Sequence, residues 1–327
     1  MRARIAGVAA YLPEQTVTSR EVEARIGPYR PHPTIVERMT GIRSRHVMRD
    51  DQQASDLAAE AAAKLLADQG AEPDLLVFAS ASQDMIEPAT GHIVAAKLGL
   101  TCPVFDIKNA CNSFLNGMQV ADALIRTGQY RRVLVCGGET PSRAIRWTVR
   151  DRPQFVDAFA GYTLSDAGSA MILEETRGGG LFEFAFSAVS AAWEIGTLPG
   201  GGSAHPRDEE FSYFSGDGRK LKDAFVGQGP ALWLDALARH DLTWDDFAVV
   251  LVHQVTLPYL EILRVILGIP AGKLVVTLPE HGNVASATMP LQLATAVAEG
   301  RLAPGDRVAF VGLAGGVSLG VAFAEWS

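Results

Sequence analysis

The sequence predicts an α/β fold made of two related halves. Short apolar runs alternate with helical patterns along the chain of 327 residues, an alternation typical of α/β proteins. Several segments of the first half also resemble segments found about 175 residues later. Together, the alternation and the repeat indicate that one α/β unit occurs twice in this chain.

Strands and helices can be assigned from the period of the apolar residues. The apolar stretch that ends before Pro13 is interpreted as a first strand, because it is too short for a signal peptide and lacks a cleavage site. Four further runs have the length of buried strands: Leu75–Ala79, residues 132–136, Val249–Val252 and residues 307–311. Helical periodicity marks Ala54–Gln69, residues 118–126 and residues 290–299.

Three pairs of positions support the duplication. The pairs are Val133 with Val308, Leu75 with Val249, and Cys111 with Ser286, at separations of 175, 174 and 175 residues. One match between apolar strands could arise by chance, but the agreement of three favours a real repeat. We therefore expect an N-terminal half at residues 1–173 and a C-terminal half at residues 174–327, related by a pseudo-twofold axis.

Composition argues against several classes of protein. The net charge of −8 and the lack of Lys or Arg runs argue against a general nucleic-acid binder. No apolar run reaches the ~18 residues that a membrane helix needs. The three cysteines cannot all pair and lack CxxC spacing, so we expect no metal site and a cytoplasmic location. Glycine-rich phosphate-binding motifs are also absent, which makes a nucleotide cofactor improbable.

Cys111 lies where an apolar run gives way to a helical pattern, in the segment FDIKNACNSFLNGMQVADAL. A free cysteine is often only a small apolar core residue. A thiol at a helix N-terminus, however, faces the positive end of the helix dipole, which lowers its pKa and favours the thiolate. We therefore favour Cys111 as a nucleophile, and we expect structural roles for Cys102, in a loop, and Cys136, at the end of a buried strand.

Two polar residues of the second half are candidates to act with Cys111. His253 directly follows the strand Val249–Val252, at the strand end where α/β proteins bind ligands, although it could also be a core histidine. Asn283 follows Gly282 in a turn, where its amide either caps a helix or donates to a developing oxyanion. The pseudo-twofold axis would bring all three side chains to one pocket between the halves.

The motifs resemble those of the thiolase superfamily, and within it the 3-oxoacyl-acyl-carrier-protein synthase III group. The matching segments cover nearly the whole chain in the family's order: MTGIRSRH, NACNSFLNG, LSDAGSAMIL, YFSGDGRKLKDAF, VHQ, GNVASATMP and GDRVAFVGLAGG. The resemblance implies a five-layered αβαβα fold and a homodimeric, cofactor-free enzyme that condenses acyl thioesters. It implies that Cys111 accepts the acyl group, that His253 and Asn283 stabilise an enolate, and that the amides of Cys111 and Gly315 form an oxyanion hole.

The segments that would bind the thioester carrier depart from the family pattern. Pro258 stands where the family has an arginine that meets the carrier protein. Ile35 and Met39 stand where a tryptophan and an arginine stack on adenine, whereas Arg150 matches a basic residue at the mouth of the coenzyme A channel. The resemblance therefore implies an acyl-CoA or an acyl-carrier-protein thioester as substrate, with Arg150, Ile35 and Met39 at the binding site.

Glu87 lies in the segment SQDMIEPATGHI, which resembles the head-to-head condensing branch that includes olefin-pathway acyl-CoA condensing enzymes and pyrone synthases. That likeness implies that Glu87 reaches across the dimer and removes a proton from the substrate α-carbon. The alternative for Glu87 is a solvated loop residue. In the first case two acyl-CoAs condense without decarboxylation, and in the second the carbanion comes from a malonyl unit.

Two other functions are compatible with these residues. In one, the pair of Cys111 and His253 transfers an acyl group to a hydroxyl or amine of a natural product, with His253 as general base. In the other, the chain is a non-catalytic partner subunit, although the presence of Cys111, His253 and Asn283 argues against it. The main hypothesis remains a β-ketoacyl-forming enzyme of fatty-acid-derived or secondary metabolism.

Overall fold

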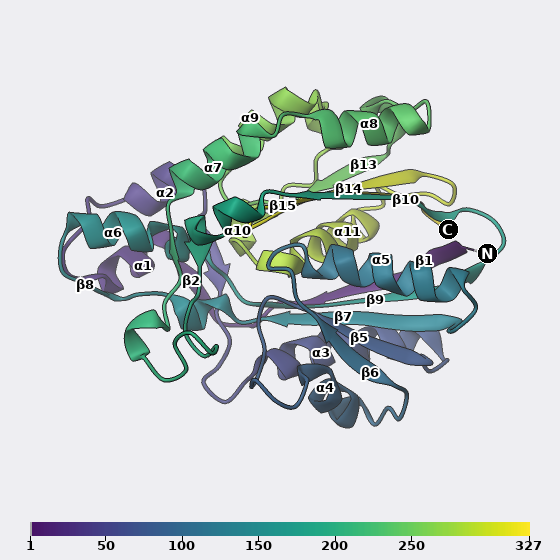
Figure 1. Cartoon of the computed structure of the whole chain (residues 1–327), viewed down its shortest axis with the longest axis horizontal. Helices are drawn as coiled ribbons and strands as arrows, with labels where there is room; N and C mark the ends of the chain where they lie inside the picture. The colour runs from purple at the N-terminus through teal and green to yellow at the C-terminus, as the bar shows by residue number, and fades with distance from the viewer. Residues whose placement is uncertain (1) are drawn as a thin grey trace.

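Two sheets form the centre of the molecule, and the computed structural model describes residues 2–327. The first sheet has the strand order β1-β9-β7-β5-β6, and the second has the order β10-β15-β14-β13 (Figure 1). Their strands are β1 (Arg2–Tyr11), β5 (Leu75–Ala79), β6 (Val104–Ile107), β7 (Arg132–Glu139), β9 (Ala167–Thr176), β10 (Gly180–Ala188), β13 (Val249–Val252), β14 (Arg307–Ala314) and β15 (Ser318–Glu325).

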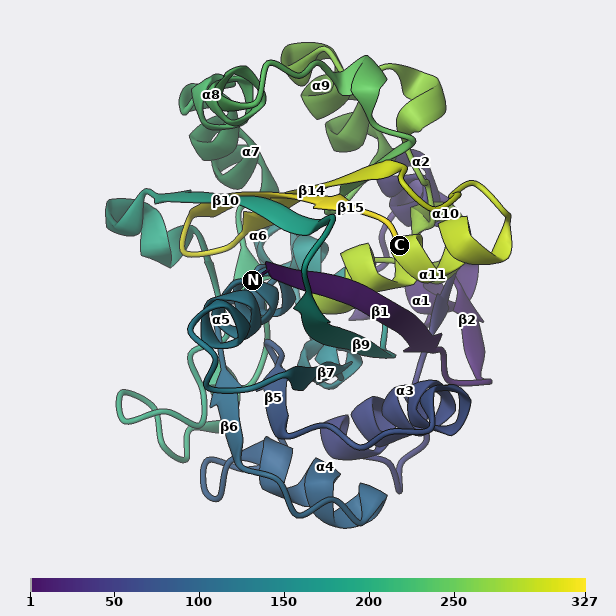
Figure 2. The same cartoon turned by 90° about the vertical axis from the view of Figure 1, so that its right-hand side faces the viewer.

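Helices complete a stack of five layers. Figure 2 shows α5 (Ser113–Arg126) and α11 (Thr288–Ala298) between the two sheets. On the outer side of the first sheet lie α3 (Ala54–Gln69) and α4 (Thr90–Leu98). The outer side of the second sheet carries α7 (Gly218–Gly227), α8 (Ala231–Arg239) and α9 (Leu257–Leu267). The predicted αβαβα arrangement is therefore confirmed.

The strand registers repeat between the two sheets. Leu75 on β5 pairs with Val133 on β7 in parallel, and Val249 on β13 pairs with Val308 on β14 in parallel. These four residues are the ones matched in the sequence. In the first sheet, β7 pairs with β9 and β9 pairs with β1, and both pairs are antiparallel. In the second sheet, β14 pairs with β15 and β15 pairs with β10, again antiparallel. The sequence repeat is therefore a repeat of strand pairing as well.

Helix α3 packs unusually close to the first sheet, and two glycines make this possible. A Cβ atom at Gly138 on β7 would lie 1.8 Å from the carbonyl oxygen of Ala54. A Cβ atom at Gly168 on β9 would lie 1.8 Å from the carbonyl oxygen of Leu57. Four alanines of α3, Ala54, Ala58, Ala61 and Ala62, are buried in the same core cluster, because only small side chains fit at this separation.

Smaller elements cover one end of the sheets and surround the cavity described below. They comprise β2 (Thr16–Thr18), α1 (Ser19–Arg25), β3 (Gly27–Pro28), α2 (Ile35–Thr40), β4 (Ser44–His46), β8 (Thr148–Val149), α6 (Arg152–Ala158), β11 (Gly196–Thr197), β12 (Ser215–Gly216) and α10 (Leu278–His281). The 3-10 helices are η1 (Pro141–Ala144), η2 (Phe159–Thr163), η3 (Ser190–Ile195), η4 (Glu209–Phe211), η5 (Trp244–Asp246), η6 (Ala271–Lys273) and η7 (Ala285–Ala287).

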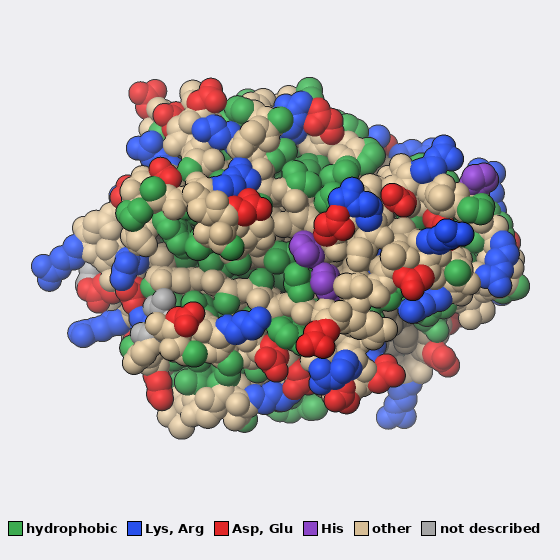
Figure 3. All heavy atoms as spheres, turned by 180° about the vertical axis from the view of Figure 1, so that it is seen from behind, with side chains coloured by type: hydrophobic (Ala, Val, Ile, Leu, Met, Phe, Trp, Pro, Cys, Tyr) green, Lys and Arg blue, Asp and Glu red, His purple; other side chains and the backbone are tan. Residues whose placement is uncertain are grey.

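The surface charges, the helix lengths and the metal-binding residue types can each be described for this chain. Acidic and basic side chains are interspersed on the face drawn in Figure 3, rather than gathered in one basic stripe. Within residues 2–327, every helix is too short or too polar to cross a membrane. Over the same residues, His, Cys, Asp and Glu side chains form no group of three or more that could hold a metal ion.

Candidate active site

Cys111 lies in the turn between β6 and α5, two residues before the helix begins. The preceding residue, Ala110, has a positive φ of 45°, a conformation that costs free energy for any residue with a Cβ atom. Ser113 holds this turn, because its hydroxyl accepts from the amide of Asn109 at 2.8 Å and donates to the carbonyl of Ala110 at 2.7 Å. The turn thus presents Cys111 in a fixed and strained geometry, as expected of a functional position.

The thiol itself differs from the sequence-based expectation. Burial raises the pKa of Cys111 to about 12, and a negative charge on Glu139 would act in the same direction. The prediction that the helix N-terminus leaves the free thiol ionised is therefore wrong for the unliganded protein, because desolvation outweighs the helix dipole. Cys111 is a protonated thiol until a substrate or another group removes the proton.

Asn112 ties the Cys111 turn to the second half of the chain. Its side-chain Nδ2 donates to the carbonyl of Ser318 at 3.2 Å and to the hydroxyl of Ser318 at 3.1 Å. Its Oδ1 lies so close to Gly312 that a Cβ atom there would be only 2.3 Å away. Both contacts involve the β14–β15 hairpin, whose turn carries Gly315. The residue proposed for the second oxyanion-hole amide therefore belongs to the same hairpin that Asn112 contacts.

His253 follows β13 directly and is 2% exposed. Its backbone N–H donates to the carbonyl of Val311 at 3.0 Å, which places it one residue from the contact between Gly312 and Asn112. Burial lowers the pKa of His253 to about 4, so the imidazole is neutral near neutral pH. The ring atom Nδ1 has no hydrogen-bond partner among residues 2–327. Among the described residues, no carboxylate is hydrogen-bonded to Nδ1, so His253 differs from the histidine of a catalytic triad.

Asn283 is held in a turn whose preceding residue, Gly282, has a φ of 66°. The backbone N–H of Asn283 donates to the carbonyl of Thr163 at 2.8 Å. Its side-chain Oδ1 accepts from the amide of Ala285 at 3.1 Å, and its Nδ2 donates to the hydroxyl oxygen of Thr163 at 3.4 Å. The second N–H of this amide group remains available to a ligand.

Gln254 connects the histidine to the asparagine turn. Its Oε1 accepts from the amides of Thr277 and Leu278, each at 3.1 Å, at the start of the short helix α10. That helix ends at His281, immediately before Gly282 and Asn283. Hydrogen bonds and close packing therefore link His253, Asn283 and the Cys111 turn, which come from both halves of the chain.

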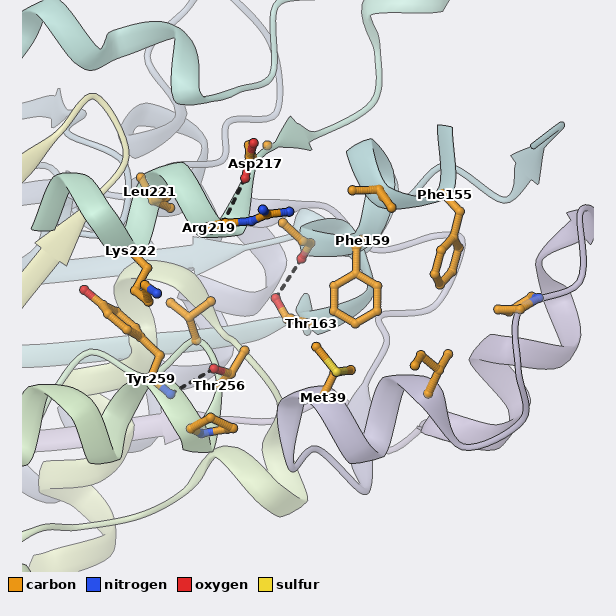
Figure 4. A pocket seen from close by; sticks show the side chains of 18 of the residues that line it. Met39, Phe155, Phe159, Thr163, Asp217, Arg219, Leu221, Lys222, Thr256 and Tyr259 are labelled. Atoms are coloured by element: carbon orange, nitrogen blue, oxygen red, sulfur yellow. Dashed lines mark hydrogen bonds between the residues drawn. The ribbon is translucent and has the colours of Figure 1, made fainter. Parts of the chain in front are cut away.

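A cavity of about 660 Å³ opens beside this network. Figure 4 shows that its side chains come from α2, α6, η2, α7 and α9, with Met39 and Phe159 across from Thr256. Thr163, which contacts Asn283, is also part of the wall. The cavity therefore extends from the surface helices to the asparagine turn, and its walls are mainly apolar.

The predicted substrate-binding residues line two separate pockets. Ile35 and Met39 line the large cavity. Arg150 does not; it lines a separate polar pocket of about 390 Å³ together with Arg146 and Tyr213. The cations of the large cavity, which the sequence analysis did not select, are Arg152, Arg219 and Lys222. Two of them lie in the quoted motif YFSGDGRKLKDAF, which is the signal that could have identified them.

Glu87 lies on the exposed loop between β5 and α4, and its peptide bond to Pro88 is cis. The two preceding residues, Met85 and Ile86, are apolar and are 49% and 73% exposed. In the single chain this loop faces solvent. A catalytic role for Glu87 therefore requires a second chain, as the sequence-based hypothesis stated.

Comparison with solved structures places this arrangement in a known class. OleA from Xanthomonas campestris, solved with bound lauric acid and lauroyl-CoA, superposes with a TM-score of 0.90 at 26% identity, covering 100% of this chain and 99% of that one. A β-ketoacyl-(acyl-carrier-protein) synthase III from Thermus thermophilus superposes with a TM-score of 0.86 at 27% identity and covers 99% of each chain. The molecule is a thiolase-fold condensing enzyme that transfers acyl groups.

Comparison of sequences identifies the family. Family models described as 3-oxoacyl-(acyl-carrier-protein) synthase III and as its C-terminal part match residues 105–190 and 237–326. The β-ketoacyl-(acyl-carrier-protein) synthase III of Desulfitobacterium hafniense strain Y51 is 32% identical, covering 99% of this chain and 97% of the relative. That of Erythrobacter litoralis strain HTCC2594 is 33% identical and covers 100% of both. The chain belongs to the 3-oxoacyl-(acyl-carrier-protein) synthase III family.

Proposed function

We propose that this enzyme joins two acyl thioesters through an acyl group held on Cys111, giving a β-ketoacyl product. The observation that carries the proposal is the set of contacts that links the Cys111 turn, His253 and Asn283, with Thr163 joining Asn283 to the cavity wall. Each of the three comes from a different turn, and the contacts between halves hold them. Such preorganised groups suit a reaction that develops negative charge on a thioester oxygen.

In the first step, the sulfur of Cys111 attacks the thioester carbonyl carbon. The new C–S bond forms as the carrier thiolate leaves, and the proton of Cys111 ends on the departing thiol. The backbone amides of Cys111 and Gly315 donate to the carbonyl oxygen, which is negatively charged in the tetrahedral intermediate. A protonated thiol in the free enzyme suits this sequence, since the proton leaves together with the carrier.

In the second step, the α-carbon of another acyl thioester attacks the acyl group on Cys111. His253 and the free N–H of Asn283 donate to the thioester oxygen on which the enolate charge develops. The new C–C bond forms, and the Cys111 sulfur leaves as the β-ketoacyl product is released. A neutral imidazole with a pKa near 4 is a poor proton acceptor, so it acts here as a hydrogen-bond donor.

The carbanion arises, in this proposal, when Glu87 of one chain takes the α-proton in the site of its partner in a homodimer. Three observations support this non-decarboxylative route over a malonyl unit. Glu87 is on an exposed loop beside the apolar Met85 and Ile86, Pro258 replaces the arginine that would meet a carrier protein, and OleA is solved with lauroyl-CoA. Acyl-CoA is accordingly the proposed substrate, in a cytoplasmic enzyme.

The large cavity would receive the coenzyme A portion of that substrate. Arg152, Arg219 and Lys222 supply positive charge for its phosphate groups. Ile35 and Met39 supply apolar contacts for the arm that carries the thiol. Thr163 marks the inner end of the cavity, where the thioester would meet Asn283.

A product assay tests the proposed function. Incubation with lauroyl-CoA alone should give a β-ketoacyl product by mass spectrometry, whereas product formation that depends on a malonyl thioester would refute the non-decarboxylative route. Glu87→Ala should abolish condensation but leave acylation of Cys111 intact. Glu72→Ala, at another exposed glutamate, is the matched control and should condense like the wild type. Acyl transfer to an added alcohol or amine in place of condensation would favour the alternative acyltransferase.

A further inference from the structure

Glu139 is the last residue of β7 and is fully buried, with 0% of its surface exposed. A carboxyl group removed from water normally pairs with a cation. Glu139 forms no salt bridge within residues 2–327, and all of its polar partners are neutral. The proposed mechanism assigns no role to this group, although a charge on it would raise the pKa of Cys111.

The carboxyl group of Glu139 joins the two halves of the chain. One oxygen, Oε1, is hydrogen-bonded to the hydroxyl of Ser286 and accepts a hydrogen bond from the amide of Ala81 at 2.9 Å. The other, Oε2, accepts from the hydroxyl of Ser82 at 3.1 Å. Ala81 and Ser82 follow β5 of the first sheet, whereas Ser286 lies on η7, three residues after Asn283. One side chain therefore fixes the asparagine turn to the end of a strand.

Ser286 occupies the position in the second half that Cys111 occupies in the first, 175 residues earlier. Both residues lie where the central helix of their half begins. The duplicated site thus carries a thiol in one half and, in the other, a hydroxyl that contacts Glu139. Glu139 also lies close enough to Cys111 for its charge to raise the pKa of the thiol.

The hydrogen bonds around Ser286 indicate which form of Glu139 fits. The hydroxyl of Ser286 lies between Oε1 of Glu139 and the carbonyl oxygen of Ala79, which is 3.4 Å away. A hydroxyl has one hydrogen, so it cannot donate to both acceptors. If Glu139 is protonated, its O–H donates to Ser286 and the hydroxyl of Ser286 donates to Ala79. The Ser286 oxygen and the Ala79 carbonyl then each accept one hydrogen bond, and no charge is buried.

We propose that Glu139 is a positioning residue of the condensation site, which holds the Asn283 turn beside Cys111 as a neutral carboxylic acid. The proposal rests on the proposed role of Cys111 as the nucleophile. A neutral acid keeps the turn in place without adding a negative charge that would oppose ionisation of the thiol. Burial raises the pKa of Glu139, and the hydrogen bonds from Ser286, Ala81 and Ser82 act in the opposite direction.

Alkylation of Cys111 by iodoacetamide, measured against pH and assigned by peptide mass spectrometry, tests the protonation state. Glu139→Gln replaces a neutral acid by a neutral amide that can still donate to Ser286. We expect its alkylation profile to have the wild-type midpoint and rates within about 3-fold of wild type. A midpoint that falls by about one pH unit, with about 10-fold faster alkylation below it, would show that Glu139 is ionised and overturn the proposal.

Steady-state kinetics of condensation test the positioning role. Glu139→Ala and Ser286→Ala should each lower kcat by about 10-fold or more with a smaller change in KM, and Glu139→Gln should restore most of kcat. If Glu139→Ala fails to fold, Ser286→Ala alone decides the outcome. Wild-type kcat in Ser286→Ala would contradict the positioning role. Failure of the wild type to form an acyl-enzyme would instead contradict the proposed function, and the alkylation profile would still report the state of Glu139.

Discussion

Asn283 is hydrogen-bonded to Thr163 through both its backbone and its side chain. The backbone N–H donates to the Thr163 carbonyl at 2.8 Å, and Nδ2 donates to the Thr163 hydroxyl oxygen at 3.4 Å. The hydroxyl hydrogen of Thr163 is already committed to the carbonyl of Ala160 at 2.8 Å, so its oxygen acts as the acceptor. Thr163 also lines the large cavity. The cavity wall, which would contact the substrate, is therefore hydrogen-bonded to the Asn283 amide, which would contact the enolate.

Replacement of Thr163 by valine should weaken condensation while keeping the shape of the wall. Thr163→Val removes the acceptor for Nδ2 of Asn283, which leaves Ala285 as the only bond that orients this amide. A hydrogen bond of this kind contributes about 0.5–1.5 kcal/mol, so kcat/KM should fall by about 2- to 10-fold. Thr127→Val, at the exposed end of α5, serves as the control and should leave kcat/KM unchanged. Equal kinetics in both variants would contradict the coupling of Thr163 to Asn283.

Reversal of one charge in the cavity should weaken acyl-CoA binding. Lys222→Glu places a negative charge where the phosphate groups are proposed to bind, so KM should rise by about 5-fold or more at low ionic strength. The increase should shrink with added salt, because ions screen exposed charges. Lys220→Glu makes the same change on the same helix, outside the cavity wall, and should have little effect. A similar rise in both variants would mean that only the net charge matters.

The buried His253 should make stability depend on pH. The pKa of histidine is about 6.5 in an unfolded chain, and burial lowers that of His253 to about 4. Between these values the unfolded chain binds a proton that the folded chain does not. The free energy of unfolding should therefore fall as the pH drops through this range, by about 1.4 kcal/mol per pH unit for this residue alone. Above about pH 6.5 the contribution is fully present.

Comparison of the wild type with His253→Asn isolates this contribution from other titrating groups. The advantage of the wild type in unfolding free energy, measured by chemical denaturation, should be smaller at about pH 5 than at about pH 7. A difference in stability that is the same at both pH values would mean that His253 titrates normally in the folded protein.

Much of the framework was predictable because it depends on local sequence. The buried strands Leu75–Ala79 and Val249–Val252 were assigned from continuous apolar runs, and their observed bounds agree. The run at residues 132–136 extends to Glu139, since the two glycines that follow Cys136 pack closely rather than end the strand. Cys111, His253 and Asn283 were selected as candidates because each was expected at the end of a strand or at a turn before a helix, and the structure places them there.

Other features depend on contacts between distant residues and could not be predicted. Glu139 ends an ordinary buried strand, and its environment is set by Ser286, which lies 147 positions away. The position of Lys222 in the cavity wall depends on where α7 lies relative to α2 and α9, which line the same cavity. The thiol of Cys111 was expected to ionise because of the helix start, but the degree of burial that reverses this effect is a property of the folded chain.

Covalent loading of Cys111 is the most direct test of the central claim. The wild-type protein should gain the mass of one acyl group when it is mixed with an acyl-CoA, and peptide mapping should place the group on Cys111. Cys111→Ala should gain no mass, whereas Cys102→Ala, at the loop cysteine, should load like the wild type. An acyl group that persists in Cys111→Ala, or that maps to another residue of the wild type, would contradict the assignment of Cys111 as the nucleophile.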